Sequence, residues 1–213
     1  MTRATIQGQT FILHPFKGIF WEEEQCMLIA DLHLGKAAHF RKAGIPVPPG
    51  VSDANWDRLI SLLFDFKPGR VLFLGDLFHS VYNQSCEDFE QIIHQFSQIS
   101  FELVKGNHDI LQDRFYESAN LKVYENSYRL GPFLFTHHPL DEVPSGQYNL
   151  AGHIHPSVRL MGQARQTLRL PCFYFGANKG ILPAFGAFTG MATIRPKKGD
   201  EIYVIAQDEV LRV

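Results

Sequence analysis

Residues 26–33 read Cys-Met-Leu-Ile-Ala-Asp-Leu-His, an apolar run that ends in an acid and, two positions later, a histidine. A short continuous apolar run is typical of a strand buried on both faces of a parallel sheet. In α/β sheets, ligands gather at the carboxyl ends of such strands. This stretch therefore predicts an α/β fold with a functional site at a strand end.

Four further apolar runs end in the same way, with a histidine, an acid or an amide. The motifs that follow them are Gly75-Asp76, Gly106-Asn107-His108-Asp109, His137-His138 and Gly152-His153-Ile154-His155. We expect the five strand ends to converge on one site. In the pairs Asp31/His33 and His153/His155 the members are two positions apart, so an extended backbone would aim both side chains at one point.

The side chains of these motifs offer carboxylate, imidazole and amide oxygen donors but no thiolate. This combination suits Mn, Fe, Ni or Zn in a mixed nitrogen and oxygen site rather than a structural zinc site. Gly75, Gly106 and Gly152 precede candidate ligands, where a residue without a side chain permits a sharp turn and a close backbone approach. The pattern predicts a metal site.

Two amphipathic helices are predicted between the first strands. Apolar residues recur at helical spacing over 56–63 and over 89–96, with Ser52 and Ser85 as candidate N-caps. A third short helix is predicted over 110–117, whereas later runs look extended. The length of 213 residues predicts a single domain, residues 1–213.

The segment 36–50 contains repeated glycine and proline and is predicted to be a long loop, which is often functional. Four basic residues or histidines lie in it, directly after the first motif: Lys36, His39, Arg41 and Lys42. We expect Lys36 and Arg41 to bind substrate phosphate. The alternative interpretation is an exposed loop that is merely solvated.

Composition narrows the function further. The net charge of −2 provides no general basic field for nucleic acid, so any phosphate affinity must be local. The three cysteines are far apart and form no CxxC pair, which argues against a disulfide framework and favours a reducing compartment. Because no secretory leader or membrane-spanning run is visible, we expect a cytoplasmic protein without a membrane partner.

Other aromatic residues receive weaker interpretations. A phenylalanine-rich stretch is predicted to be sandwich core rather than a platform for stacking bases; it comprises Phe173, Phe175, Phe185 and Phe188. His79 lies three residues after Asp76 and is a minor candidate for substrate contact.

Taken in order, the five motifs resemble those of the calcineurin-like metallophosphoesterase superfamily over the whole chain. The resemblance implies a four-layer αββα sandwich with a dinuclear site at strand ends, holding two divalent ions, Mn²⁺ or alternatively Fe or Zn. One ion would be held by Asp31, His33, Asp76 and His155. The other would be held by Asp76, Asn107, His137 and His153, with Asp76 bridging. His108 would be the catalytic histidine, oriented by Asp109, and His137 rather than His138 would bind metal.

Residues 30–48 and 182–190 carry a closer resemblance, to the ligase-associated DNA-damage-response endonuclease family. These stretches are not needed for metal binding, so they are more specific to that family. The resemblance implies a bacterial phosphodiesterase or endonuclease that acts on DNA in repair, with an ATP-dependent DNA ligase and a helicase as associated proteins.

Two other functions stay open. A small-molecule phosphodiesterase acting on a nucleotide or a UDP-sugar lipid would need the same metal site, and the net charge of −2 favours a small substrate. Superfamily enzymes of the UDP-sugar lipid type usually carry arginine where this chain has His108, which argues against that substrate. A non-enzymatic scaffold should have lost ligand positions, and none is missing here.

Overall fold

The parallel strands of the first sheet form where the sequence predicts buried apolar runs. The computed structural model describes residues 1–42, 44, 50–79, 81–161 and 166–213. Four parallel strands lie side by side in it: β4 (Cys26–Ile29), β5 (Arg70–Leu74), β6 (Ser100–Val104) and β7 (Leu121–Tyr124). Three antiparallel strands extend the sheet beyond β4: β3 (Ile19–Trp21), β2 (Gln9–Leu13) and β1 (Thr2–Ile6).

The parallel strands are apolar on both faces because both faces are covered. On β4, Met27 and Ile29 pack toward the helices, while Leu28 packs toward the second sheet. On β5, Phe73 packs toward the helices and Leu72 packs toward the second sheet. This alternation explains why the strands read as unbroken apolar runs.

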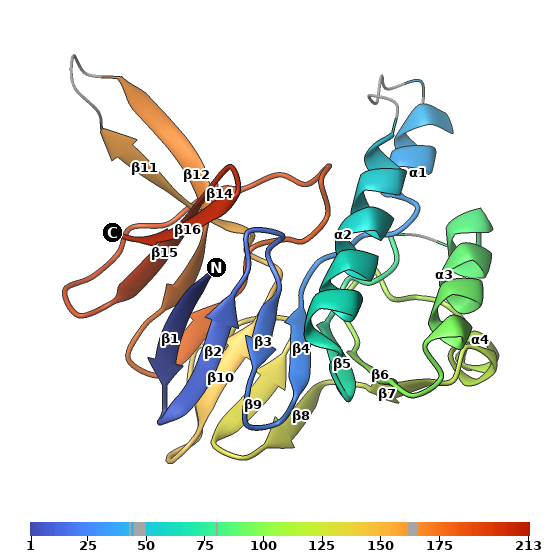
Figure 1. Cartoon of the computed structure of the whole chain (residues 1–213), viewed down its shortest axis with the longest axis horizontal. Helices are drawn as coiled ribbons and strands as arrows, with labels where there is room; N and C mark the ends of the chain where they lie inside the picture. The colour runs from blue at the N-terminus through green and yellow to red at the C-terminus, as the bar shows by residue number, and fades with distance from the viewer. Residues whose placement is uncertain (43, 45–49, 80, 162–165) are drawn as a thin grey trace.

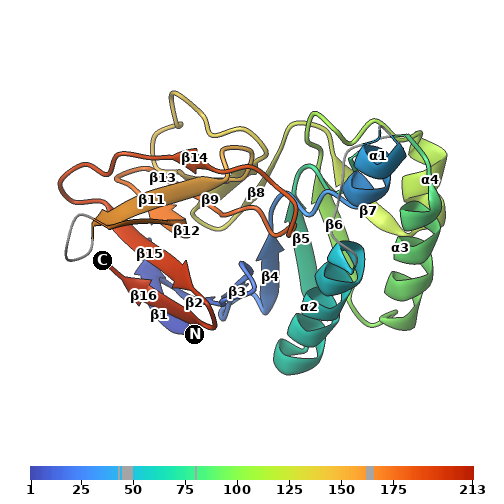
Figure 2. The ribbon, with the colours of Figure 1, turned by 90° about the horizontal axis from the view of Figure 1, so that it is seen from above.

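Helices cover one face of the first sheet (Figures 1 and 2). They are α1 (Lys36–Lys42), α2 (Val51–Phe66), α3 (Gln84–Gln95) and α4 (Asp113–Ser118). The predicted N-caps are wrong: α2 follows Gly50, and Asn83 caps α3 by accepting a hydrogen bond from the Ser85 N–H. Across the described ranges, no helix is both long and apolar enough to span a bilayer.

The predicted loop over 36–50 is wrong in its first half, because α1 occupies residues 36–42. This piece reads Lys-Ala-Ala-His-Phe-Arg-Lys, and most of these residues favour a helix. The glycines and prolines that suggested a loop come later, and residues 43 and 45–49 lie outside the described part of the chain. Gly35, with φ of 83°, lets the chain turn from the first motif into α1.

The second sheet has a parallel centre with antiparallel additions. Its central strands are β9 (Phe133–Thr136), β10 (Tyr148–Ala151) and β13 (Lys179–Ile181). The strands around them are β8 (Ser127–Leu130), β11 (Pro156–Met161), β12 (Thr167–Phe175), β14 (Ala192–Thr193), β15 (Glu201–Ala206) and β16 (Glu209–Arg212).

The predicted α/β metallophosphoesterase fold is confirmed in its stacked sheets and in one helical layer. The expected second helical layer does not occur among the described residues, which contain no helix after Ser118. The outer face of the second sheet instead carries a small apolar cluster around Cys172 and Val204.

An aromatic core joins the two sheets and fixes how they sit on each other. Phe11 and Trp21 of the first sheet meet Phe133 of the second, with ring centroids 5.2 Å and 5.0 Å from that ring. Phe173 and Phe175 are buried in the same core, and Phe185 is buried against the helices, as predicted. The carboxyl ends of strands from both sheets are thereby held at one common edge.

Candidate metal centre

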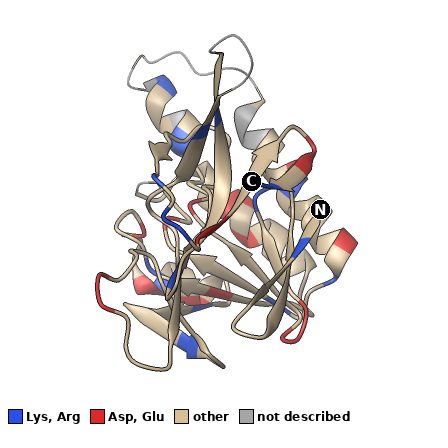
Figure 3. Ribbon diagram, turned by 90° about the vertical axis from the view of Figure 1, so that its left-hand side faces the viewer, with Lys and Arg blue, Asp and Glu red and all other residues tan. Residues whose placement is uncertain are grey.

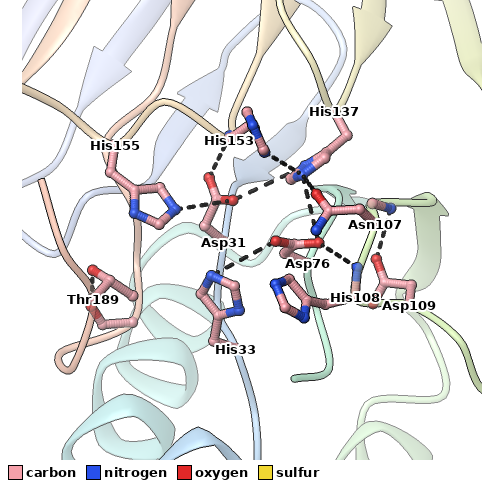
Figure 4. Close-up of polar contacts among 12 residues, drawn as sticks. Asp31, His33, Asp76, Asn107, His108, Asp109, His137, His153, His155 and Thr189 are labelled. Carbon is pink, nitrogen blue, oxygen red and sulfur yellow. Dashed lines mark hydrogen bonds and ion pairs between the residues drawn. The ribbon is translucent and has the colours of Figure 1, made fainter. Parts of the chain in front are cut away.

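All seven predicted metal ligands lie together at this edge (Figure 4). The first sheet supplies four of them, from the ends of β4, β5 and β6: Asp31, His33, Asp76 and Asn107. The second sheet supplies three, from the ends of β9 and β10: His137, His153 and His155. The convergence expected of the five strand ends is present.

The backbone reaches this geometry through left-handed turns rather than extended chain. Positive φ angles of 50° to 65° occur at five of the candidate ligands: Asp31, His33, Asp76, His153 and His155. A residue with a Cβ atom adopts such angles at a cost of about 1 kcal/mol or more, although Asp and His tolerate them better than most residues do. The predicted extended pairs are therefore wrong as geometry, because each strand ends before its motif, although both pairs do aim at one place.

Hydrogen bonds to a neighbouring loop hold these strained turns in place. The N–H of Asp31 donates to the carbonyl of Gly75 at 3.1 Å, and the N–H of His33 donates to the carbonyl of Asp76 at 2.9 Å. Five strained residues gathered at one edge of a fold are typical of a functional site.

The glycines before the ligands are required for space, as predicted. A Cβ atom on Gly152 would lie 2.6 Å from Oδ2 of Asp31. Cβ atoms on Gly75 and Gly106 would collide with the ring of His137 and the carboxylate of Asp76. The ligand side chains pass directly over these backbone positions.

The two carboxylates are buried and share their hydrogen bonds between loops. Asp31 is 0% exposed, and its Oδ2 accepts the His153 N–H at 2.9 Å, while its buried Oδ1 has no hydrogen-bond donor. Asp76 is 3% exposed, and its Oδ1 accepts the His108 N–H at 2.9 Å. Two buried carboxylates side by side require a compensating positive charge.

The imidazoles turn lone pairs toward these carboxylates. Nδ1 of His137 lies 3.0 Å from the carbonyl of Leu74, and Nδ1 of His155 lies 3.0 Å from the carbonyl of Gly190. Because a carbonyl only accepts, each Nδ1 must be the protonated nitrogen.

In the neutral form of each ring the other nitrogen, Nε2, is an acceptor, and it faces a carboxylate oxygen. These nitrogens lie 3.2 Å from Oδ1 of Asp31 for His155, and 3.5 Å from Oδ1 of Asp76 for His137. Two acceptors at this distance repel each other unless a positive charge lies between them. A proton-donating contact behind each ligating ring is typical of metal-binding histidines, so the residues present fit divalent metal ions.

Burial keeps several of these histidines neutral. It lowers the pKa of His33 to about 2, with the Lys36 charge acting in the same direction. Burial also lowers the pKa values of His153 and His138 below the ordinary value. The neutral ring is the form that binds a metal ion.

His137 and His138 occupy different positions. His137 is 2% exposed and its Nε2 lies 3.1 Å from Oδ1 of Asn107 and 3.2 Å from Nδ1 of His153. His138 is exposed, and its ring centroid lies 3.8 Å from that of His153. Both histidines are within reach of a metal beside His153, so the preference for His137 stays a prediction.

His108 lies at the margin of the cluster, next to His79. The two rings are stacked, with centroids 4.9 Å apart at 26°, and the ring of His108 meets that of His33 edge-on at 5.5 Å. His79 is a member of this site that the sequence indicated only weakly, through its position three residues after Asp76.

Asp109 does not contact the His108 ring. Its carboxylate accepts the Phe78 N–H at 3.0 Å and the Gly106 N–H at 2.8 Å, so it ties together the loops that follow β5 and β6. Any orientation of His108 by Asp109 would therefore act through these loops, and that role stays a prediction. Burial raises the pKa of Asp109 to about 7.

Lys36 is half-buried beside the cluster, while Arg41 is exposed on the same helix. Burial lowers the pKa of the Lys36 ammonium, and the charges of Asp76 and Asp31 oppose this shift. Lys36 therefore lies within electrostatic reach of both acids.

Comparisons with known proteins give the family. The family described as calcineurin-like phosphoesterase matches residues 26–175. The crystal structure of Pseudomonas putida nuclease MPE is similar over 100% of this chain and 99% of that chain, with 27% identity and a TM-score of 0.78. The structure of Yfce, a phosphoesterase from E. coli, covers 88% of this chain and 97% of that chain, with 13% identity and a TM-score of 0.46. No curated protein matches.

The matched residues 26–175 contain all seven candidate ligands. Proteins of this family use divalent metal ions, which agrees with the donor set found at the strand ends. The nuclease among the structural neighbours is consistent with the resemblance to the ligase-associated endonucleases. The chain therefore belongs to the calcineurin-like phosphoesterase family and is a metal-dependent phosphoester hydrolase.

Proposed function

We propose that this protein hydrolyses phosphodiester bonds in DNA as a dinuclear-metal nuclease of bacterial DNA repair. The observation that carries the proposal is the buried cluster in which two carboxylates face imidazole lone pairs from a second sheet. The similarity to Pseudomonas putida nuclease MPE over the whole chain supports a nucleic acid as the substrate, and the resemblance to the ligase-associated endonucleases favours DNA.

Two ions, for which we propose Mn²⁺, would be held by overlapping ligand sets. Asp31, His33 and His155 offer donor atoms within 4.8 Å of one another, as do Asp31, Asp76 and His137. With Asp76 shared, Asp31, His33, Asp76 and His155 would hold the first ion. Asp76, Asn107, His137 and His153 would hold the second.

The protein's own residues would then position and neutralise the substrate. Divalent ions at such a site polarise the phosphate and lower the pKa of water, so that hydroxide is available near neutral pH. We assign His108 to the leaving oxygen, to which its half-buried ring would donate a proton. Asp76 holds the His108 backbone, and Asp109 holds the two loops on either side, so both act as positioning residues.

Lys36 and Arg41 would bind phosphates that flank the scissile bond. Lys36 lies within the field of the buried acids, and Arg41 is exposed further along α1. These two cations extend the site along one direction, as a polymeric substrate requires. We further propose, from the family resemblance, that an ATP-dependent DNA ligase and a helicase are partners, and that the protein works in the cytoplasm, where its three free cysteines stay reduced.

A small-molecule phosphodiesterase is the second candidate. The net charge of −2 favours it, and Figure 3 shows segments with Lys or Arg and segments with Asp or Glu along the ribbon in this view. A nucleotide would need only the metal centre and Lys36.

Purified protein loaded with Mn²⁺ separates these candidates. It should be tested on single-stranded and double-stranded DNA, cyclic nucleotides and a chromogenic phosphodiester, with Asp76→Asn as the inactive control. We expect cleavage of DNA and of the chromogenic ester. Turnover of nucleotides without DNA cleavage would support the second candidate, and no turnover of any phosphodiester would contradict both.

A further inference from the structure

The loop 185–190, which the metal motifs do not include, is fastened directly to the metal centre. The N–H of Phe185 donates to the carbonyl of Ala30 at 2.8 Å, and the N–H of Gly186 donates to the carbonyl of Asp31 at 3.1 Å. At the other end, the carbonyl of Gly190 accepts from Nδ1 of His155 at 3.0 Å. A side chain carried between these ties is therefore held beside two candidate ligands.

Phe188 is that side chain, and it differs from the other phenylalanines of its stretch. Phe173 and Phe185 are fully buried, whereas Phe188 is only half-buried. Its ring meets Phe40 of α1 edge-on, with centroids 5.5 Å apart at 76°. The prediction that all four phenylalanines are core is wrong for Phe188, which lies at the rim of a polar site.

A pocket of about 330 Å³ opens at this rim. It is lined by Lys36, Phe40, Ala187, Phe188, Thr189 and Gly190. Lys36, Phe188 and Thr189 also line a smaller cleft together with His33. The pocket therefore adjoins the metal centre and combines two aromatic side chains with one ammonium group.

The two aromatic side chains suit the base of a nucleotide, and the ammonium group suits its phosphate. Aromatic side chains stack on nucleobases of any sequence, and lysine pairs with phosphate. A small polar ligand without a ring would gain nothing from the two phenylalanines. A purely apolar ligand would gain nothing from the half-buried Lys36.

We propose that the pocket binds the nucleobase next to the scissile phosphate, stacked on Phe188 and meeting Phe40 edge-on, with Lys36 on the adjoining phosphate. This inference rests on the proposed function, phosphodiester hydrolysis in DNA. It adds a subsite that recognises a base without reading its sequence.

Two esters with the same leaving group test the subsite. Thymidine 5′-(4-nitrophenyl phosphate) carries a base, and its abasic deoxyribose counterpart does not. For the wild-type protein with Mn²⁺, kcat/KM should favour the thymidine ester by about 5- to 100-fold, the range expected of one stacked base. In Phe188→Ala this ratio should fall toward one, while Phe188→Tyr should retain most of it.

Phe64→Ala is the matched control, because Phe64 is an exposed phenylalanine of α2 outside the pocket, and it should keep the wild-type ratio. A wild-type ratio of one, or a ratio that persists in both Phe188→Ala and Phe40→Ala, would overturn the subsite. An equal loss on both esters in Phe188→Ala would also overturn it, because Phe188 would then only support the loop at His155. In each of these cases hydrolysis by the wild type would leave the proposed function standing. If the wild type hydrolysed neither ester, the proposed function would fail and the subsite with it.

Discussion

The two sheets make unequal contributions to the metal centre. The first sheet supplies both carboxylates, Asp31 and Asp76, and its loops are joined to each other through backbone hydrogen bonds. The second sheet supplies only imidazoles, and these reach the first sheet where Nε2 of His155 meets Asp31 and where Nδ1 of His137 meets the carbonyl of Leu74. The negative charge of the centre thus comes from the first sheet alone, whereas both sheets contribute imidazoles. Neither sheet carries a complete site, so packing of the sheets and metal binding should be coupled.

The largest effect is expected from removing charge from the first sheet. Asp76→Asn keeps the size of the side chain but removes the carboxylate that both ligand sets share. We expect loss of both ions and a fall in turnover of about 10³-fold or more, since the electrostatic stabilisation goes with them. His153→Asn, in the second sheet, should lose one ion only. Equal metal loss in both variants, measured by elemental analysis, would contradict the claim that the first sheet contributes more to metal binding than the second.

His108→Ala should separate chemistry from metal binding within the first sheet. Its backbone N–H, not its ring, binds Asp76, so the ligands should stay in place. Turnover of a substrate with a poor leaving group should fall by about 10²- to 10⁴-fold, the usual contribution of a positioned acid. Normal turnover at normal metal content would remove His108 from the mechanism.

Loosening the contact between the sheets should weaken both stability and metal binding. Phe133 is 0% exposed in the aromatic core that joins them, so Phe133→Ala should cost about 3–5 kcal/mol in the free energy of unfolding. Denaturant titrations should show one cooperative transition, as expected of the single domain we propose, and weaker metal affinity. Phe64→Ala, on the exposed surface, is the control. Two separate transitions would show that the sheets fold independently.

The helix next to the first sheet should affect a polymer more than a small ester. Replacing Lys36 and Arg41 together with alanine removes two cations outside the metal ligands. We expect KM for DNA to rise about tenfold and its salt dependence to flatten, because fewer counterions are released on binding. Hydrolysis of a small chromogenic phosphodiester should change less. Equal changes on both substrates would indicate a disturbed metal centre instead.

The smallest effect concerns pH. Burial lowers the pKa of His33 to about 2 and lowers that of His153 below 6.5, so both rings resist protonation. Because the pKa is lowered, the neutral form of the ring, which binds metal, persists down to a lower pH. Metal content should therefore be constant from pH 8 to 6.5 and fall only in more acidic solution, with the ion beside His153 leaving first. Dialysis at a series of pH values tests this, and a loss centred at pH 6.5 would speak against it.

The sequence predicted which side chains lie together at this edge because each motif is local: a few polar residues directly follow a buried strand. It could not predict the left-handed turns at Asp31 and His33, since these depend on hydrogen bonds to a neighbouring loop. The hydrogen bond from the Phe78 N–H to Asp109 could not be predicted for the same reason, because the two residues are 31 positions apart in the sequence. Among the elements, the edge strand β1 and its neighbour β2 were not predicted, since they are only partly apolar and owe their order to the strands beside them.

The number of metal ions bound per chain tests the central claim most directly. Protein freed of metal, dialysed against Mn²⁺ and measured by elemental analysis should contain two ions per chain, and His153→Asn should contain one. A wild-type protein that binds no divalent ion, or that binds one ion unaffected by His153→Asn, would contradict a centre shared between the two sheets.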